Sequence, residues 1–480
     1  MRGAAPSVLL VLALLASHAP ALHGQRDMGR RAVEALDYPP IDFRPPVPDE
    51  WDVDGVPVLM IEDHGLPLVS VYARFRGGYG LFGREYYAAG TALPSQLRYG
   101  GTTELSPDSV DKALEYYAIQ TSFGGAGEAI SATMNTLVEH LPTAIELWGS
   151  VLARPAFDST QVEIWRGRQL ESVRRRGDDP GGLAFSEFNR LLYGDHPVGW
   201  EMDASDLSSE RLSSQRLAEV HRRVVCRENL VLGLTGDVTW RDMRPLLETL
   251  VRKVPPCEGT LPPSPIPSIR DEPGVYLIER DLEQSVIVMA HTTDVHLADD
   301  PSYYSATIGN SILGGGGFSS RILSRVRTEE GFAYSASSLW TMPRRYDGLL
   351  GAITRTRPEN TIPAIELILE TMEGLRTAPP EAGEVQTAIE RIVNGFVFNF
   401  DTPGQIVSRT MFYVAQDLPR DWLERYLEGV RRVTAAGIHD AFARHLRPAD
   451  MMILIVGDPE RIGREAIEAL GPVTVLDVRR

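Results

Sequence analysis

The stretch "LGGGGFSSRILSRVRTEEGFAYSASS", Leu313–Ser338, runs from four glycines through a basic segment to a tyrosine. A glycine run before a helix often cradles phosphate, but a P-loop needs Lys and then Ser or Thr after its last glycine. Phe318 and Ser319 follow here, and Ser320 stands where the third glycine of a G-x-G-x-x-G would be. The stretch is therefore a weak nucleotide-binding motif, and its role has to be inferred from the rest of the sequence.

The chain around this stretch repeats itself. Three pairs of segments match, namely "VLMIED" from Val58 with "VYLIERD" from Val275, "VSVYARF" from Val69 with "VIVMAHT" from Val286, and "YYAA" from Tyr86 with "YYSA" from Tyr303. Their offsets are equal, since 275 − 58, 286 − 69 and 303 − 86 all give 217. "AIEL" recurs at 144 and 364, and two strands ending in "GD" close at 237 and 458. Ordered matches with so little drift predict a tandem duplication.

Each copy opens with two adjacent strands and proceeds through amphipathic helices to a closing strand. This order predicts an α+β fold in which each copy forms a mostly antiparallel sheet with helices packed on it. We expect two homologous domains that face one another across a cleft, over residues 25–254 and 274–480. The stretch 255–273 contains seven prolines and predicts a stiff linker between them.

Composition narrows the function. A chain of 480 residues with 43% hydrophobic and 24% charged residues is typical of a soluble globular protein. The net charge of −17 argues against nucleic-acid binding. Residues 1–24 have a basic start, an apolar run and then small residues, which predicts a secretory signal peptide. We therefore expect an exported protein, periplasmic or secreted, with no membrane span.

The chain has two cysteines, Cys226 and Cys257. An oxidising compartment permits a disulfide between them, and two isolated core thiols are an equally good interpretation. No C-x-x-C occurs, which excludes a cysteine zinc site of that kind.

The duplicated layout, with "FSSRILSRVRTEEGFAYS" in the second copy, resembles the insulinase/pitrilysin/mitochondrial processing peptidase family. "FRGGYG", "PAFD" and "IVNGFVFNFD" fit the same pattern, and the resemblance extends from about Trp51 to Asp458. Active members of this family carry H-x-x-E-H on a helix of the first domain. Its two histidines hold Zn²⁺, its glutamate acts as the base, and a downstream glutamate completes the ligands.

The corresponding span here, Ala88–Thr102, contains no His, Asp or Glu, and Pro94 is expected to kink a helix there. No two of the ten histidines are spaced i, i+4. His291 and His296 are expected on one strand, where a separation of five turns them to opposite faces. Glu171 falls near the family's third-ligand position, but without the two histidines it would be a single ligand and would not bind zinc tightly. The sequence thus predicts no metal in this chain, and zinc is expected in a partner chain.

The resemblance implies catalytic roles for Arg327 and Tyr334, which match the family's second-domain pair. A guanidinium suits a peptide carbonyl, and a phenol suits a developing oxyanion. Gly331 is expected to end the helix in a left-handed cap, so that both side chains can point at one spot. The alternative is a surface Arg–Glu pair and a tyrosine packed in the sheet.

Gly315, Gly316, Gly317 and Phe318 are expected to bind substrate, by resemblance to a glycine-rich loop of the processing peptidase's non-catalytic subunit. The alternative is that the glycines permit tight strand–helix packing. In the first copy, "SFGGAGEAISATM" from Ser122 resembles the family's edge strand, which pairs with extended peptide.

These features predict a non-catalytic subunit of an exported heterodimeric zinc metallopeptidase. It would bind extended peptides and supply Arg327 and Tyr334 to a homologous partner that bears H-x-x-E-H. Hydrolysis is expected only with that partner, and a homodimer is a further assembly to consider. The alternative function is that of a catalytically inert structural or peptide-binding homologue.

Overall fold

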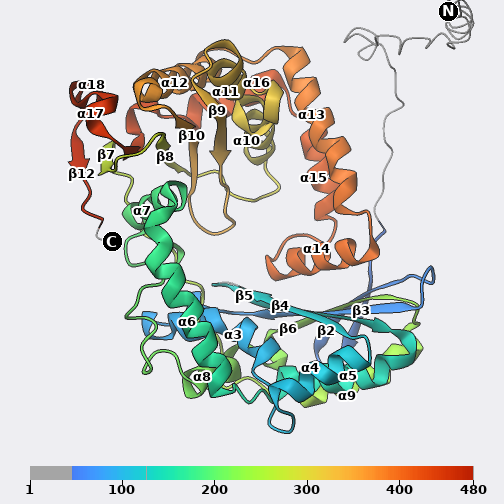
Figure 1. Ribbon diagram of the computed structural model, residues 1–480. Helices are drawn as coiled ribbons and strands as arrows, with labels where there is room; N and C mark the ends of the chain where they lie inside the picture. Colours follow the sequence, from blue (N-terminus) through green and yellow to red (C-terminus); the bar gives the residue numbers. More distant parts are fainter. Residues whose placement is uncertain (1–45, 126, 479–480) are drawn as a thin grey trace, which may run out of the picture. The chain divides into compact units, whose positions relative to one another are not determined.

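Two six-stranded sheets organise the protein, as the computed structural model shows for residues 46–125 and 127–478. The first sheet has the strand order β1-β2-β6-β3-β5-β4 (Figure 1). Its strands are β1 (Asp49–Val53), β2 (Val56–Glu62), β3 (Leu68–Arg76), β4 (Gln120–Gly125), β5 (Ala129–Leu137) and β6 (Leu230–Gly236).

The second sheet has the order β12-β7-β11-β8-β10-β9. Its strands are β7 (Gly274–Glu279), β8 (Ser285–Thr293), β9 (Ala333–Trp340), β10 (Gly348–Thr356), β11 (Met452–Gly457) and β12 (Val473–Val475). Five successive strands therefore have the same arrangement in both sheets, from β2 to β4 in one and from β7 to β9 in the other.

The strand directions repeat as well. The β2–β6 and β7–β11 pairs are parallel, and the pairs that follow in each sheet are antiparallel. The sheets differ in the strand added at the outer side, since β1 is antiparallel to β2 whereas β12 is parallel to β7. The predicted fold class, a duplicated α+β unit with a mostly antiparallel sheet, is confirmed.

Helices cover both sheets. Those of the first half are α3 (Tyr87–Tyr99), α4 (Pro107–Tyr116), α5 (Leu141–Ala153), α6 (Ser159–Arg175), α7 (Pro180–Tyr193), α8 (Ser214–Val224) and α9 (Trp240–Lys253). Those of the second are α10 (Pro301–Asn310), α11 (Arg321–Leu323), α12 (Thr361–Thr377), α13 (Ala382–Phe396), α14 (Pro403–Ala415), α15 (Trp422–Arg431), α16 (Ala435–His445), α17 (Pro459–Ile462) and α18 (Arg464–Ala469).

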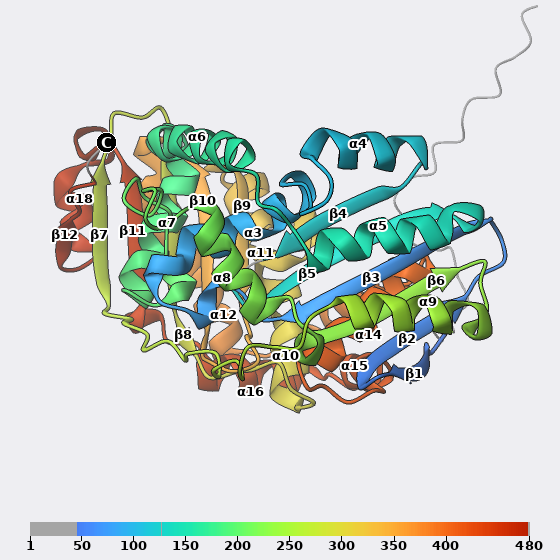
Figure 2. The same ribbon diagram turned by 90° about the horizontal axis from the view of Figure 1, so that it is seen from below.

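The main core of the first half lies between its sheet and α3, α5, α8 and α9, and Figure 2 shows this layer of helices in front of the strands. Strand β3 shows why the layer forms on one face. Val71 and Phe75 are fully buried in this core, while Tyr72 and Arg74 alternate with them and are half-buried on the opposite face.

That opposite face is covered by a helix from the other half. Helix α14 lies along β6, β2 and β3, where Val407 and Met411 pack against Leu59 (Figure 1). In return, α7 packs on β8 and β11 of the second sheet, with Leu183 and Phe188 buried there. Each half thus completes the other's hydrophobic packing.

Gly233 of β6 permits the close approach of α14. A Cβ atom there would lie 2.5 Å from both Met411 Sδ and Val407 Cγ1, which is closer than such atoms can pack. The strand therefore needs glycine where the helix crosses it.

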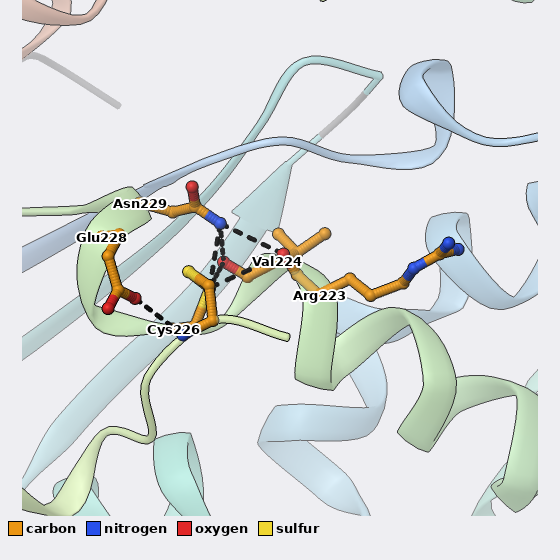
Figure 3. The surroundings of a disulfide bond; sticks show 6 residues. Arg223, Val224, Cys226, Glu228 and Asn229 are labelled. Carbon is orange, nitrogen blue, oxygen red and sulfur yellow. Dashed lines mark hydrogen bonds between the residues drawn. A yellow bond between two sulfur atoms is a disulfide. The ribbon is translucent and has the colours of Figure 1, made fainter. Parts of the chain in front are cut away.

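Cys226 and Cys257 form a disulfide, which selects one of the two interpretations that the sequence allowed. Figure 3 shows its surroundings. The Asn229 amide donates to the carbonyl oxygens of Arg223 and Val224, at 3.1 and 3.2 Å. The Glu228 carboxylate accepts the Cys257 N–H at 2.7 Å, and this bond lowers the pKa of Glu228. The bridge ties the segment before β6 to the proline-rich stretch.

The proline-rich stretch contains no helix or strand between residues 254 and 273. It is nonetheless attached to both halves, since the Arg270 N–H donates to Leu192 O at 2.8 Å and Ser264 Oγ accepts from Arg345 at 3.0 Å. The predicted domain boundaries stay predictions, and the signal peptide at 1–24 lies outside the described residues. Within residues 46–125 and 127–478, no helix is long and apolar enough to cross a membrane.

Candidate functional site

Arg327, Tyr334 and Phe318 form one cluster. The guanidinium carbon of Arg327 lies 4.5 Å from the centroid of the Tyr334 ring and 4.8 Å from that of Phe318. These distances are within the range of cation–π attraction, which contributes roughly 0.5–1 kcal/mol at an exposed site. The structure thus brings together three residues that the sequence singled out.

A short reversal of the chain builds this cluster. The helix α11 continues as a π-helix from Ser324 to Glu329, a wider form than the α-helix expected there. Gly331 then takes a φ of +65°, as expected of a left-handed cap, and the Phe332 N–H donates to Val326 O at 2.8 Å. The strand β9 begins at Ala333, so Tyr334 returns beside the turn that carries Arg327.

The cluster faces solvent. The exposed fraction is 79% for Tyr334 and 73% for Phe318, and Arg327 is half-buried between them. Over residues 46–125 and 127–478, no carboxylate lies within 4.0 Å of the Arg327 guanidinium. The alternative of an Arg–Glu pair beside a packed tyrosine is therefore not the arrangement that the structure has.

An ion pair at the start of the segment holds it in place. The Arg321 guanidinium binds both carboxylate oxygens of Glu384 on α13, at 2.9 and 2.6 Å. These hydrogen bonds lower the pKa of Glu384, whose carboxylate also accepts the Glu381 N–H at the N-terminus of α13. Paired guanidinium–carboxylate bonds fix orientation as well as distance.

The glycines before the cluster do not all serve one purpose. A Cβ atom on Gly314 would lie 2.3 Å from Ser338 N of β9, so this glycine is required for tight packing. Gly317 has a φ of +71° and is exposed with Gly315, while Gly316 is half-buried. Arg391 of α13 contacts Ser319, a support that the sequence did not indicate because the two lie 72 residues apart. Substrate binding by Gly315, Gly316, Gly317 and Phe318 stays a prediction.

Helix α3 occupies the span where active relatives carry H-x-x-E-H, and its residues do not fit zinc. The helix continues through Pro94 as far as Tyr99, so the proline does not end it, and the kink expected there stays a prediction. Two of its buried side chains have polar atoms. The Gln96 Nε2 atom donates to Gln161 O at 3.3 Å, and the Tyr87 hydroxyl donates to Trp200 O at 3.0 Å. Ala92 lies four residues before Gln96, the spacing of the two histidines in H-x-x-E-H, and its side chain cannot bind a metal. Helix α3 therefore offers neither paired imidazoles nor a carboxylate base.

The other candidate metal ligands take part in other interactions. The exposed Glu171 carboxylate on α6 forms an ion pair with Arg175 of the same helix, at 2.5 Å. Cys226, Glu228 and Cys257 come close together, but both sulfurs are in the disulfide. His291 is fully buried on β8, whereas His296 lies beyond the end of that strand, which corrects the expectation that one strand carries both.

The expected edge strand of the first half is β4, which forms the end of its sheet and pairs only with β5 among the described strands. Its counterpart in the second sheet is β9, the edge strand that carries Tyr334. An edge strand can accept an extended peptide as an added strand, and such pairing by β4 stays a prediction.

The fold and the site define a duplicated two-sheet chain whose helix α3 contains no histidine, cysteine or carboxylate. Comparison with known proteins agrees with this class. Residues 211–392 match the family model described as the peptidase M16 inactive domain. Among solved structures, a peptidase M16 inactive domain from Pseudomonas fluorescens has a TM-score of 0.76 at 22% identity, covering 86% of this chain and 98% of that one.

Curated relatives agree as well. The "Non-peptidase homolog YmxG" of Helicobacter pylori is 22% identical over 409 residues, covering 85% of this chain and 93% of that protein. An "uncharacterized zinc protease" of Mycobacterium tuberculosis is 25% identical over 348 residues, covering 70% and 77%. The periplasmic protease PqqL of Escherichia coli has a TM-score of 0.74 at 13% identity, and this chain spans 51% of its length. The chain is thus similar to M16-type proteins over most of its length, which confirms the resemblance seen in the sequence.

Proposed function

We propose that the chain is a non-catalytic subunit of an exported M16-type metallopeptidase. It would bind extended peptide and present Arg327 and Tyr334 to a site whose metal ligands come from a homologous partner bearing H-x-x-E-H. The observation that carries the proposal is an asymmetry between the halves. Helix α3 has no ligand residues, while the half-buried Arg327 lies beside the exposed Tyr334, with no carboxylate within 4.0 Å of its guanidinium in the described chain.

The chemistry of the pair suits this role. A guanidinium carries five N–H donors, and one without a carboxylate partner can hold a peptide carbonyl. The Tyr334 hydroxyl can donate a hydrogen bond to an oxygen that gains negative charge as the peptide bond is attacked. Stacking on the two rings would limit the motion of the guanidinium before substrate arrives.

Export is supported by two independent features. Residues 1–24 have the pattern of a secretory signal peptide. The Cys226–Cys257 disulfide is of a kind that persists in oxidising compartments and is rare in the cytosol. The periplasmic description of PqqL belongs to that protein but is compatible with this location.

The test is reconstitution. The chain is used to capture its partner from the native periplasmic or secreted fraction, and the complex is assayed for cleavage of a fluorogenic peptide. Because a lost donor to a developing oxyanion typically lowers the rate by about 10²–10³-fold, Tyr334→Phe should reduce kcat strongly. Arg327→Ala removes the group that holds a peptide carbonyl and should lower kcat/KM. Size-exclusion chromatography should show unchanged assembly.

Two exposed residues of the first half provide matched controls. Arg168→Ala removes a guanidinium from α6, and Tyr116→Phe removes a hydroxyl from a tyrosine that is 80% exposed. Both control variants should cleave at the wild-type rate. Full activity in the Arg327 and Tyr334 variants would remove the catalytic role from this pair.

A second candidate function is a catalytically inert structural or peptide-binding homologue. The name of the Helicobacter relative, a non-peptidase homologue, favours it. This function predicts a stable complex whose properties do not change when Arg327 and Tyr334 are replaced. The reconstitution experiment therefore discriminates between the two.

A further inference from the structure

A cavity of about 550 Å³ lies between segments of both halves. Its walls include Arg74 and Ser131 of the first sheet, Tyr346 from the loop between β9 and β10, and Phe412 of α14. An adjoining cavity of about 330 Å³ shares Arg74 and adds Arg76 and Arg345. The first volume is in the range of roughly 300–1,000 Å³ that small-ligand sites occupy.

Arg74 is half-buried and has no anionic partner in direct contact. Its Nη1 atom donates to Ser131 Oγ at 3.3 Å, and its guanidinium lies 5.8 Å from the centroid of the Phe412 ring. Its Nε atom is buried with no hydrogen-bond partner, a costly state for a charged donor. With Nη1 engaged and Nε buried, Nη2 is the guanidinium nitrogen left to pair with an anion in the cavity.

The one acidic side chain that lines both cavities is already paired. The Glu128 carboxylate forms an ion pair with Arg345, whose guanidinium also donates to Ser264 Oγ at 3.0 Å. Over residues 46–125 and 127–478, neither Arg74 nor Arg76 has a carboxylate within 4.0 Å. The cavities therefore carry unneutralised positive charge, although the chain as a whole has a net charge of −17.

Aromatic rings surround this charge. Tyr79, Tyr346 and Phe412 line the larger cavity and come from three separate segments. Such walls favour an apolar group attached to the anion, because stacking and burial of apolar surface stabilise it there. An inorganic anion such as phosphate has no apolar group and would gain nothing from these walls.

We propose that this cavity binds the C-terminal carboxylate of a peptide whose last side chain is apolar. The carboxylate would pair with Arg74, and the side chain would lie among Tyr79, Tyr346 and Phe412. The inference deepens the proposed function, on which it rests for the peptide nature of the ligand. Because residues of both halves line the cavity, a bound peptide end would also link them.

The test is calorimetric and uses the purified chain alone. The probes are acetyl-Ala-Ala-Phe with a free C-terminus and the same tripeptide with a C-terminal amide. Because the amide cannot form the charge-assisted pair with Arg74, its Kd should be at least about tenfold higher than that of the free acid. In Arg74→Gln the two probes should bind alike, and in Arg74→Lys, which keeps the positive charge but not the planar guanidinium, the preference should be reduced. Arg168→Gln on α6 should keep the full preference.

Equal binding of acid and amide by the wild type, no binding of either, or an undiminished preference in Arg74→Gln would overturn the proposal. A third probe, acetyl-Ala-Ala-Glu with a C-terminal amide, tests the source of the carboxylate. Binding of this probe as tight as that of the free acid would assign the site to acidic side chains and overturn the C-terminal assignment. Since no partner, metal or cleavage is involved, the result is independent of the reconstitution experiment.

Discussion

His221 shows how the environment of one side chain makes stability depend on pH. It is 5% exposed on α8, and its ring Nε2 atom lies 2.7 Å from Leu152 O. Burial lowers the pKa of His221 from 6.5 to about 4, so the ring is neutral in the folded protein at neutral pH. Its Nε2–H then donates to the carbonyl oxygen.

The first prediction follows from this lowered pKa. As the pH falls below 6.5, the unfolded chain binds a proton at His221 before the folded chain does, so stability decreases between pH 6.5 and pH 4. Between pH 7 and pH 5 the loss should be about 2 kcal/mol from this group. Urea unfolding at the two pH values should show a smaller loss in His221→Gln, with His439→Gln on α16 as the control. Equal losses in the wild type and His221→Gln would contradict it.

The residue scale also shows what the sequence can and cannot predict. Arg327 and Tyr334 were predictable because eight consecutive residues build their contact through a glycine turn. Arg74 was not, since its surroundings come from β3, β5 and α14, which are distant in sequence. No local pattern marks an arginine on the polar face of a strand as a ligand-binding group.

At the scale of elements, strands and several helices were predictable because their signals are local. A serine before Pro107 is a local helix-start signal, and the Ser106 Oγ accepts the Ser109 N–H at the start of α4. The strand repeats likewise recur as β2 and β7, and as β3 and β8. The exchange of α7 and α14 between the sheets depends on long-range packing, and no periodicity in either helix indicates which sheet it covers.

The crossing of α14 over β6 gives a second prediction. Gly233→Ala should destabilise the protein by about 1–3 kcal/mol, because its Cβ would be forced against Met411 and Val407. Gly124→Ala is the matched control on the exposed edge strand β4, where nothing lies within 4 Å of the added atom. Its effect should stay within about 0.5 kcal/mol. Equal denaturation midpoints for the two variants would show that the crossing is not tightly packed.

At the scale of the whole molecule, duplication supplied two similar halves that have diverged in their chemistry. The first half keeps the helix α3 at the position of the zinc motif but fills it with alanine, leucine and an amide. The second keeps a half-buried guanidinium and an exposed phenol beside a glycine-rich turn. Such a division is expected of a chain that completes a site together with another chain.

The most direct test of this account is the zinc content of the purified chain and of its complex with an H-x-x-E-H partner. After dialysis against zinc-containing and then zinc-free buffer, mass spectrometry of the metals should find no stoichiometric zinc on the chain alone. It should find one zinc for each chain–partner pair, together with peptide cleavage. One tightly held zinc per isolated chain, with hydrolysis in the absence of any partner, would contradict the account.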